Sequence, residues 1–338
     1  MKKTSMFFLV TVFALALCFS PAQAKTINLK LSYHFPPVAV TAKVLAEYVE
    51  KIEKETNGRV KIKIYPSATL HHVKDAYEAV KSGISDMTFT GVPVAPHAWP
   101  LNQVFNLPAV GVPMGKDSVA FYKEAWKAAP ELAKEMSDIK VLMMANYVPE
   151  TYIHTSKKLV RVPDDIKGMK MIGIGAFVNY IKATGANAVN LMPNDFYAAL
   201  ERGVAEGVMF PSGPLDIHGL TELVPYHLTL DLAAPLFMLF MNLDKWNAIS
   251  SEDKEIINRL NEWVSNEQVA RNLVFEAKVV AKFKKLGHTV TKPTPEEFKL
   301  WQDAGEFMLN NWIKKNEAKG RPAKKVFENV KKVADKYK

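Results

Sequence analysis

The sequence predicts an α/β protein of two lobes, with one long helix that spans both. The chain has 338 residues, more than a single hydrophobic core usually holds, so two lobes are expected. Segments with the hydrophobic period of a strand alternate with segments that have the period of a helix, which is the α/β pattern. Hydrophobic residues make up 48% of the chain and charged residues 23%, a balance that excludes wholesale disorder.

The first 24 residues are expected to be a secretory signal peptide. Two lysines follow the initiating methionine, an almost unbroken apolar stretch covers residues 6–19, and Ala22-Gln23-Ala24 is a small-x-small cleavage signal. Because the apolar stretch is short for a membrane span, we favour cleavage after Ala24 over an uncleaved anchor. The only cysteine, Cys18, leaves with this peptide, so the mature chain is expected to hold no disulfide and no cysteine-based metal site.

The first half of the mature chain, expected to form the first lobe (residues 25–147), alternates strands with helices. Val60, Ile62 and Ile64 alternate with charged residues, as in a half-exposed strand, and Asn57-Gly58 is typical of a left-handed helix end. The β-α-β-α-β order predicts parallel strands with right-handed crossovers. The expected elements are strands over 28–34, 60–64 and 85–90, with helices from about 41 to 57 and from about 72 to 83.

The second lobe (residues 148–237) repeats this alternation. Its two helices are expected to end at Gly185 and Gly203, because glycine most readily adopts the left-handed conformation that closes a helix. The expected elements are strands over 169–174, 188–191 and 207–210, with helices over 177–185 and 194–203.

Beyond Trp246 the chain is almost wholly helical. Ser250 and Asp253 resemble a capping box at the start of a helix of roughly 35 residues, which at 1.5 Å per residue is ~50 Å long and reaches across both lobes. Thr294 and Glu297 mark a further helix start, and a basic amphipathic helix begins near Ala323. We assign residues from about 238 to 280 to the first lobe and the C-terminal helices, about 281–338, to the second.

Common catalytic and cofactor motifs are missing from the sequence. It contains no G-x-S-x-G nucleophile elbow and no G-x-x-x-x-G-K-[ST] phosphate loop, and Gly173-Ile174-Gly175 lacks the third glycine of a dinucleotide fingerprint. The eight histidines are scattered, and the adjacent pair His71-His72 would point in two directions on a helix. We therefore expect no catalytic residue, no metal and no cofactor.

Charge adds a weaker argument about the partner. Loss of the two leader lysines lowers the formal net charge from +9 to +7, which favours anionic small molecules in a general way. Basic residues are interspersed with acidic ones, so we expect no nucleic-acid partner. An exported protein of two α/β lobes without catalytic motifs predicts a binding protein whose ligand lies between the lobes, near the carboxyl ends of the strands.

A series of motifs resembles one family through nearly the whole mature sequence. The most specific covers residues 162–170, Val-Pro-Asp-Asp-Ile-Lys-Gly-Met-Lys, and matches a P-x-D-L-K-G-x-K signature. The other matching stretches are 58–61 leading to Tyr65-Pro66, then 83–87, 105–108, 185–187, 197–204 and 206–207. In this order and spacing they resemble the periplasmic solute receptors of TRAP transporters, of the C4-dicarboxylate-receptor (DctP-like) type.

The resemblance implies a two-lobed periplasmic binding protein fold, type II-like, which closes on a small-molecule organic acid. It implies a periplasmic location and a transport role in which TRAP membrane permease subunits take over the ligand. A monomer is expected, because the receptor must present both lobes to the permease. Two other classes stay open: a sensory module that feeds a signalling partner, and an exported hydrolase or isomerase on a similar scaffold.

The departures from the family pattern predict an unusual ligand. Ile172 stands where the family has an arginine that pairs with the ligand carboxylate, Tyr152 falls where many members carry a second arginine, and Phe210 replaces an asparagine. A carboxylate placed against Ile172 would lose at least ~10-fold to 100-fold in affinity. With Met209, these residues predict an apolar wall suited to an aromatic or alkyl group. The alternative is that Ile172 and Met209 are core residues of their strands.

Three polar residues at strand and helix ends are the ligand-binding candidates of the first lobe. His34 follows the first strand, where many members of the family place a ligand-binding polar residue, and Thr90 ends the third strand. His72 begins a helix, where backbone N–H groups and the helix dipole favour an anion. Each of them could instead be an ordinary loop or cap residue. The predicted ligand is an organic acid, or acid-like solute, with an apolar or aromatic part.

Overall fold

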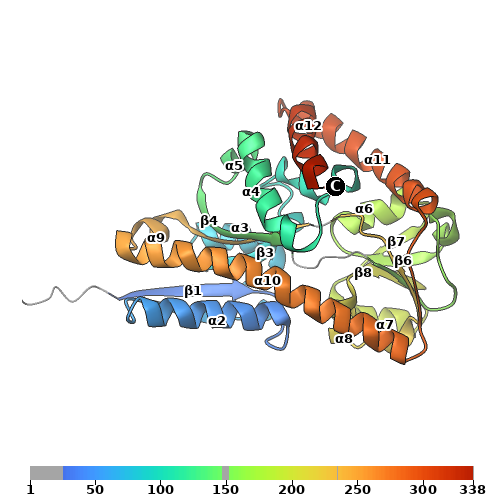
Figure 1. Ribbon diagram of the computed structural model, residues 1–338, viewed down its shortest axis with the longest axis horizontal. Helices are drawn as coiled ribbons and strands as arrows, with labels where there is room; N and C mark the ends of the chain where they lie inside the picture. Colours follow the sequence, from blue (N-terminus) through green and yellow to red (C-terminus); the bar gives the residue numbers. More distant parts are fainter. Residues whose placement is uncertain (1–25, 147–151, 234, 338) are drawn as a thin grey trace, which may run out of the picture.

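Two β-sheets, each flanked by helices, form two lobes (Figure 1). The computed structural model describes residues 26–146, 152–233 and 235–337, so the expected signal peptide lies outside the described residues. The predicted α/β class, the two lobes and the long helix across both are confirmed.

The first sheet contains the strands of the leading half of the chain and one strand from much later. In the described residues its strands are β1 (Ile27–Tyr33), β2 (Val60–Tyr65), β3 (Met87–Gly91), β4 (Ile139–Asn146) and β10 (Leu236–Asn242), in the order β2-β1-β3-β10-β4. β1 pairs in parallel with β2 and β3, as predicted, whereas β10 pairs antiparallel with β3 and β4. Lys61 and Lys63 of β2 face solvent opposite buried Val60 and Ile62, which suits a strand at the edge of a sheet.

The second sheet is also mixed. Its described strands are β5 (Tyr152–Thr155), β6 (Lys170–Gly173), β7 (Asn187–Asn190), β8 (Gly207–Phe210), β9 (Tyr226–Thr229) and β11 (Thr289–Thr291), in the order β11-β9-β5-β8-β6-β7. β6 pairs in parallel with β7 and β8, in line with the predicted alternation. β5 lies antiparallel between β8 and β9, because the chain enters this sheet from the opposite direction.

Helices flank both sheets and connect the lobes. The described helices are α2 (Val40–Glu55), α3 (Ala76–Lys81), α4 (Ser118–Ala128), α5 (Pro130–Lys134), α6 (Ala176–Ala183), α7 (Phe196–Glu201), α8 (Ser212–Ile217), α9 (Leu243–Asn247), α10 (Ser251–Lys285), α11 (Pro295–Glu317) and α12 (Ala323–Ala334). The 35 residues of α10 pack against α2 and β4 in the first lobe and against α8 and β11 in the second. One rigid element therefore belongs to both lobes (Figure 1).

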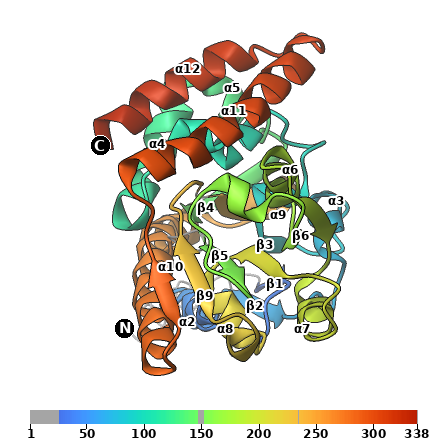
Figure 2. The same cartoon turned by 90° about the vertical axis from the view of Figure 1, so that its right-hand side faces the viewer.

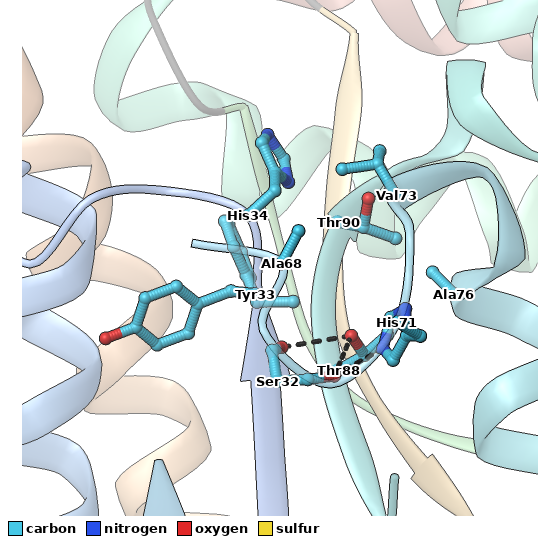
Figure 3. Close-up of a pocket in the computed structure, with 10 residues that line it drawn as sticks. Ser32, Tyr33, His34, Ala68, His71, Val73, Ala76, Thr88 and Thr90 are labelled. Atoms are coloured by element: carbon cyan, nitrogen blue, oxygen red, sulfur yellow. Dashed lines mark hydrogen bonds between the residues drawn. The ribbon is translucent and has the colours of Figure 1, made fainter. Parts of the chain in front are cut away.

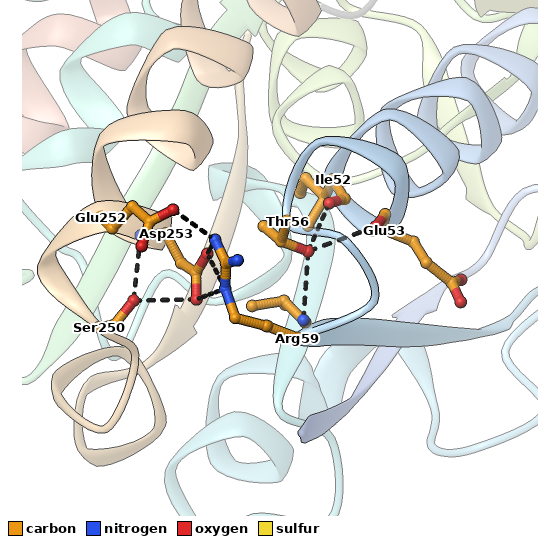
Figure 4. A network of polar contacts seen from close by, with 8 residues as sticks. Ile52, Glu53, Thr56, Arg59, Ser250, Glu252 and Asp253 are labelled. Carbon is orange, nitrogen blue, oxygen red and sulfur yellow. Dashed lines mark hydrogen bonds and ion pairs between the residues drawn. The ribbon is translucent and has the colours of Figure 1, made fainter. Parts of the chain in front are cut away.

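A polar cluster attaches the beginning of α10 to the turn between α2 and β2 (Figure 4). Ser250 caps the helix by accepting the backbone N–H of Asp253 at 3.1 Å, as the sequence predicted. Asp253 is 3% exposed, and Arg59 Nη2 donates to its Oδ1 at 2.7 Å and to Glu252 Oε1 at 2.8 Å. The same turn carries Thr56, whose hydroxyl accepts the N–H of Val60 at 3.2 Å.

The sequence analysis assigned the C-terminal helices to the second lobe, but they also pack on the first. Trp301 of α11 lies in the core of the second lobe, and Thr294 and Glu297 form the predicted capping box at its start. Further along, Trp312 and Val326 join the core beneath α4, because the apolar face of α12 packs on that helix. Both views show α11 and α12 together along one side of the molecule (Figures 1 and 2).

Removing Arg59 is expected to destabilise the first lobe. In Arg59→Ala the buried Asp253 carboxylate loses its charged partner, and an uncompensated buried charge is costly. The melting temperature should therefore fall. Glu252→Gln is the matched control, since the Glu252 side chain is 72% exposed and an exposed ion pair contributes little. Equal melting temperatures of the two variants in calorimetry would contradict this role for the Arg59–Asp253 pair.

Candidate functional site

The edges of the two sheets that face each other are set by the chain crossings between the lobes. The chain leaves the first sheet at Asn146, the end of β4, and enters the second at Tyr152, the start of β5. It returns from Thr229, the end of β9, to Leu236, the start of β10. Since an extended chain covers at most ~3.6 Å per residue, each crossing spans at most ~25 Å. The carboxyl ends of β1, β3, β6 and β8 therefore lie on the sides of the two sheets that face the other lobe, which we call the cleft edge.

The lobes touch where the chain leaves β6. Gly175 has φ +56°, and a Cβ there would lie 3.4 Å from Cβ of Pro93, which follows β3 in the first lobe. A side chain would be strained by the backbone conformation. The backbone conformation thus favours glycine here, and the 3.4 Å separation shows that the two strand ends lie close together.

A small pocket opens at the carboxyl ends of β1 and β3 (Figure 3). Its walls come from these two strands, from the loop after β2 and from the start of α3. The lining residues are Ser32, Tyr33, His34, Ala68, His71, Val73, Ala76, Thr88, Phe89 and Thr90. Two of the three first-lobe candidates, His34 and Thr90, are among them.

The floor of this pocket is a closed hydrogen-bond network. His71 Nδ1 lies 2.9 Å from the backbone oxygen of His72, which can only accept, so Nδ1 carries the proton and Nε2 accepts from Ser32 Oγ at 2.6 Å. Thr88 donates its hydroxyl to the Ser32 backbone oxygen at 3.0 Å, and Ser85 donates to that of Met87 at 2.6 Å. This network satisfies its own members.

Thr90 differs from the floor residues because its hydroxyl has no partner. The residue is 2% exposed, and its Oγ1 makes no hydrogen bond in the described structure. Figure 3 shows Thr90 apart from the hydrogen-bonded network of Ser32, Thr88 and His71. A buried hydroxyl without a partner costs ~1–3 kcal/mol, so a polar ligand atom beside Thr90 would relieve that cost.

His34 lies at the same end of the pocket and is uncharged at neutral pH. Its ring packs on that of Phe35, with centroids 3.9 Å apart, and burial lowers the pKa of His34 to about 4. The imidazole therefore offers one donor and one acceptor without a charge. His34 and Thr90 can hold a polar group together, but neither supplies a cation.

His72 does not line this pocket, and its neighbour His71 does. His72 is exposed and precedes the short 3₁₀ helix Val73–Asp75 without capping it through its side chain. Its backbone is extended, with φ −68° and ψ 152°, so adjacent side chains point in different directions. Sequence reasoning missed His71, because the pair itself gives no signal of which member faces inward.

In the second lobe, Tyr152 and Phe210 lie side by side on paired strands at the cleft edge. They are directly opposite in the β5–β8 register. Tyr152 is 2% exposed and its ring stacks on that of His154 at 5.4 Å. Phe210 is half-buried, with its ring edge-on to Phe196 at 5.2 Å. Phe210 is therefore the aromatic candidate with surface left for a ligand.

Ile172 and Met209 lie in hydrophobic cores on opposite faces of the second sheet. Ile172 is 0% exposed and shares a core with Phe196 and Leu215, while Met209 is 1% exposed and shares another with Tyr180. This burial fits the alternative that both are core residues of their strands. Their contact with a ligand stays a prediction.

No arginine is among the described residues that line the first-lobe pocket. The sequence has six arginines, all within the described residues, and four of them pair with carboxylates: Arg59, Arg161, Arg259 and Arg271. Arg202 is exposed after α7, and Arg321 lies between α11 and α12. The first-lobe pocket therefore lacks the bidentate carboxylate clamp that arginine provides, and the replacement of a ligand-binding arginine by Ile172 stays a prediction.

Two further findings concern the described residues as a whole. Their histidine, cysteine, aspartate and glutamate side chains form no group of three or more that could hold a metal ion. None of their helices combines the length and the apolar character needed to cross a membrane.

Two lobes joined by a spanning helix, with candidate polar and aromatic groups at the facing strand ends, define a solute-binding protein. A family model described as bacterial extracellular solute-binding protein, family 7, matches residues 32–316. The chain belongs to this family, the DctP family, and the predicted resemblance to TRAP receptors is confirmed. The family consists of periplasmic substrate-binding receptors, which bind small organic acids and work with membrane permease components.

Known proteins similar to this chain bind acids of different shapes. The C4-dicarboxylate-binding periplasmic protein of Rhodobacter capsulatus is 27% identical over 253 residues, covering 72% of this chain and 74% of that protein. A TRAP solute-binding protein from a marine metagenome, specific for aromatic acids and solved with 3-hydroxybenzoate, has a TM-score of 0.82 at 24% identity over 93% of this chain and 99% of its own. One from Chromohalobacter salexigens with bound D-glucuronate has a TM-score of 0.80 at 19% identity, covering 90% and 99%.

The two pocket threonines are expected to respond oppositely to valine. Thr90→Val removes a buried hydroxyl without a partner, so the ligand-free protein should become more stable by ~1 kcal/mol. Thr88→Val is the matched control on the same strand. It should lower the stability of the ligand-free protein by a similar amount, because it breaks the hydrogen bonds to Ser32. Urea unfolding of both variants measures the difference. A loss of stability in Thr90→Val equal to that in Thr88→Val would show that the Thr90 hydroxyl has a structural partner.

Proposed function

We propose that this protein is the extracytoplasmic solute receptor of a TRAP-type transporter, for an organic acid or acid-like solute with an apolar or aromatic part. The ligand binds between the lobes and is delivered to the membrane permease subunits. The observation that carries the choice of ligand is that Phe210, opposite Tyr152 at the end of β8, is only half-buried, while no arginine lines the described first-lobe pocket. The mature receptor begins after Ala24, works in the periplasm and is a monomer.

The proposed ligand pose divides the ligand between the lobes. Thr90 and His34 hydrogen-bond its polar end in the first lobe, each bond contributing ~0.5–1.5 kcal/mol. The half-buried ring of Phe210 stacks on its apolar part, which contributes ~0.5–1.5 kcal/mol beyond area burial. Closure of the lobes then removes both ends from water. The aromatic acid receptor of the marine metagenome, with which this chain shares its fold, supports an aromatic acid as the first ligand to test.

A thermal-shift screen is expected to separate acids by their apolar part. Succinate and malate are compared with benzoate, 3-hydroxybenzoate, phenyl- and indole-acetates and medium-chain acids. The apolar acids should stabilise the protein as RT ln(1 + [L]/Kd), or ~2.7 kcal/mol at 100 times Kd, and the dicarboxylates should not. Stabilisation by succinate or malate alone would contradict the proposed ligand class and leave the family assignment intact.

The contribution of Phe210 can be measured with two matched leucine variants. Phe210→Leu removes the ring while keeping an apolar side chain against Phe196, so calorimetry with the best acid from the screen should show affinity reduced ~5- to 10-fold. Phe307→Leu is the control, because Phe307 is 63% exposed on α11, away from the strand ends. An unchanged affinity in Phe210→Leu would place Phe210 outside the binding site.

A further inference from the structure

Three histidines that are far apart in the sequence form a hydrogen-bonded chain through the second lobe. His154 of β5 and His227 of β9 are both 0% exposed, and their Nδ1 atoms are 2.7 Å apart. His227 Nε2 lies 3.0 Å from Nδ1 of the half-buried His288, which follows α10. At the other end, His154 Nε2 lies 2.9 Å from the backbone oxygen of Phe210. The chain of histidines thus runs from half-buried His288 to the Phe210 carbonyl at the cleft edge.

The contact between His154 Nε2 and the Phe210 backbone oxygen fixes the direction of every hydrogen bond in this chain of histidines. A carbonyl oxygen can only accept, so His154 Nε2 carries a proton and, in a neutral ring, its Nδ1 accepts from His227 Nδ1–H. His227 Nε2 then accepts from His288 Nδ1–H. Burial keeps the inner rings neutral, since it lowers the pKa of His154 well below its usual value and that of His227 to about 3. Nε2 of His288 is the acceptor left over, at the half-buried end.

Aromatic rings and a backbone contact hold the three histidine rings in place. Phe283 of α10 lies flat on His227, with centroids 4.0 Å apart and planes at 7°, and Tyr152 stacks on His154. Thr291 of β11 donates its hydroxyl to the backbone oxygen of His227 at 3.3 Å. The titratable and charged groups around the chain of histidines are Tyr152, His218 near Phe210, the buried Glu276 of α10, the ion pair of Lys282 with Asp216, Lys284 and Lys285 in the last turn of α10, and Tyr226 of β9.

We propose that His154 is a positioning residue for Phe210 and that His227 and His288 hold it in the donating tautomer, so that the protonation of His288 is transmitted to the end of β8. This inference rests on the proposed function, because Phe210 is the aromatic wall of the proposed site. An added proton enters at His288 Nε2. The chain accommodates it without losing a hydrogen bond, because each of its three contacts still holds one proton. The carbonyl of Phe210 then accepts from a more polarised donor.

NMR of the full mature protein tests the direction of the chain without any ligand. With the histidine rings labelled with ¹⁵N, long-range ¹H–¹⁵N correlations at pH 7.5 should show His154 as the Nε2–H tautomer. His227 and His288 should appear as Nδ1–H, the minor tautomer of a free histidine side chain. If the three histidines only filled space in the core, nothing would select this combination of tautomers. Finding His227 as Nε2–H would overturn the proposal.

The transmission of His288 protonation to Phe210 is tested by an acid titration of protein whose phenylalanine carbonyls are labelled with ¹³C. The Phe210 carbonyl shift should follow the midpoint of His288. In His227→Phe, which keeps a ring against Phe283 but removes both nitrogens, His288 should still titrate while Phe210 no longer follows it. His288→Gln, which can donate a hydrogen bond but does not titrate, should abolish the same response with less risk to folding. His97→Gln, at an exposed position, is the control and should leave it unchanged.

The two proposals fail separately. If the Phe210 carbonyl shift does not change while His288 titrates in the unaltered protein, the proposed role of the three histidines is overturned. A response that persists in His288→Gln would overturn it as well. Neither readout depends on a ligand, so a lack of stabilisation by any organic acid would count against the proposed function alone.

Discussion

The structure depends on α10 being part of two lobes at once. A helix that packs on one core can keep a single apolar stripe, but α10 changes partners along its 35 residues, from α2 and β4 to α8 and β11. Its buried positions accordingly include polar side chains: Asn261, Ser265, Gln268, Asn272 and Glu276. Tyr48 of α2 donates to Asn261 Oδ1 at 2.6 Å, and the N–H of Gly213 in α8 donates to Glu276 Oε1 at 2.7 Å. Such directional bonds fix the rotation and register of the helix against each lobe, which apolar contacts alone do less sharply.

Three candidate ligand-binding groups at the facing strand ends, Thr90, His34 and Phe210, carry no charge at neutral pH. The first lobe presents the Thr90 hydroxyl and a neutral His34, and the second presents aromatic rings whose backbone is tied to neutral imidazoles. Neutral groups are desolvated at a lower cost than ions when the lobes close. The binding free energy then depends on apolar contact and on a few hydrogen bonds, rather than on an ion pair.

Most of the secondary structure could be predicted from the sequence, because hydrophobic period and capping residues act locally. The parallel pairing of β1, β2 and β3, the Ser250 and Thr294 caps and the length of α10 all followed from such patterns. Local patterns could not show that α12 packs on the first lobe. They also could not tell which of His71 and His72 faces the pocket, since one peptide unit separates them. The histidine chain was invisible for a different reason: its members are 73 and 61 residues apart, and only the β5–β9 pairing and the turn after α10 bring them together.

In the proposed site, the lack of an arginine among the residues that line the first-lobe pocket would disfavour a ligand with two carboxylates. A dicarboxylate enclosed between Thr90 and Phe210 would bury a second carboxylate against an aromatic ring, and an unpaired buried charge costs several kcal/mol. An aromatic or alkyl acid buries its apolar part there at a gain of ~25 cal/mol per Å². The cost of the unpaired charge exceeds the ~1.4 kcal/mol that corresponds to a factor of ten in affinity. In the proposed site, selectivity would therefore arise as much from the missing partner for a second charge as from the aromatic wall.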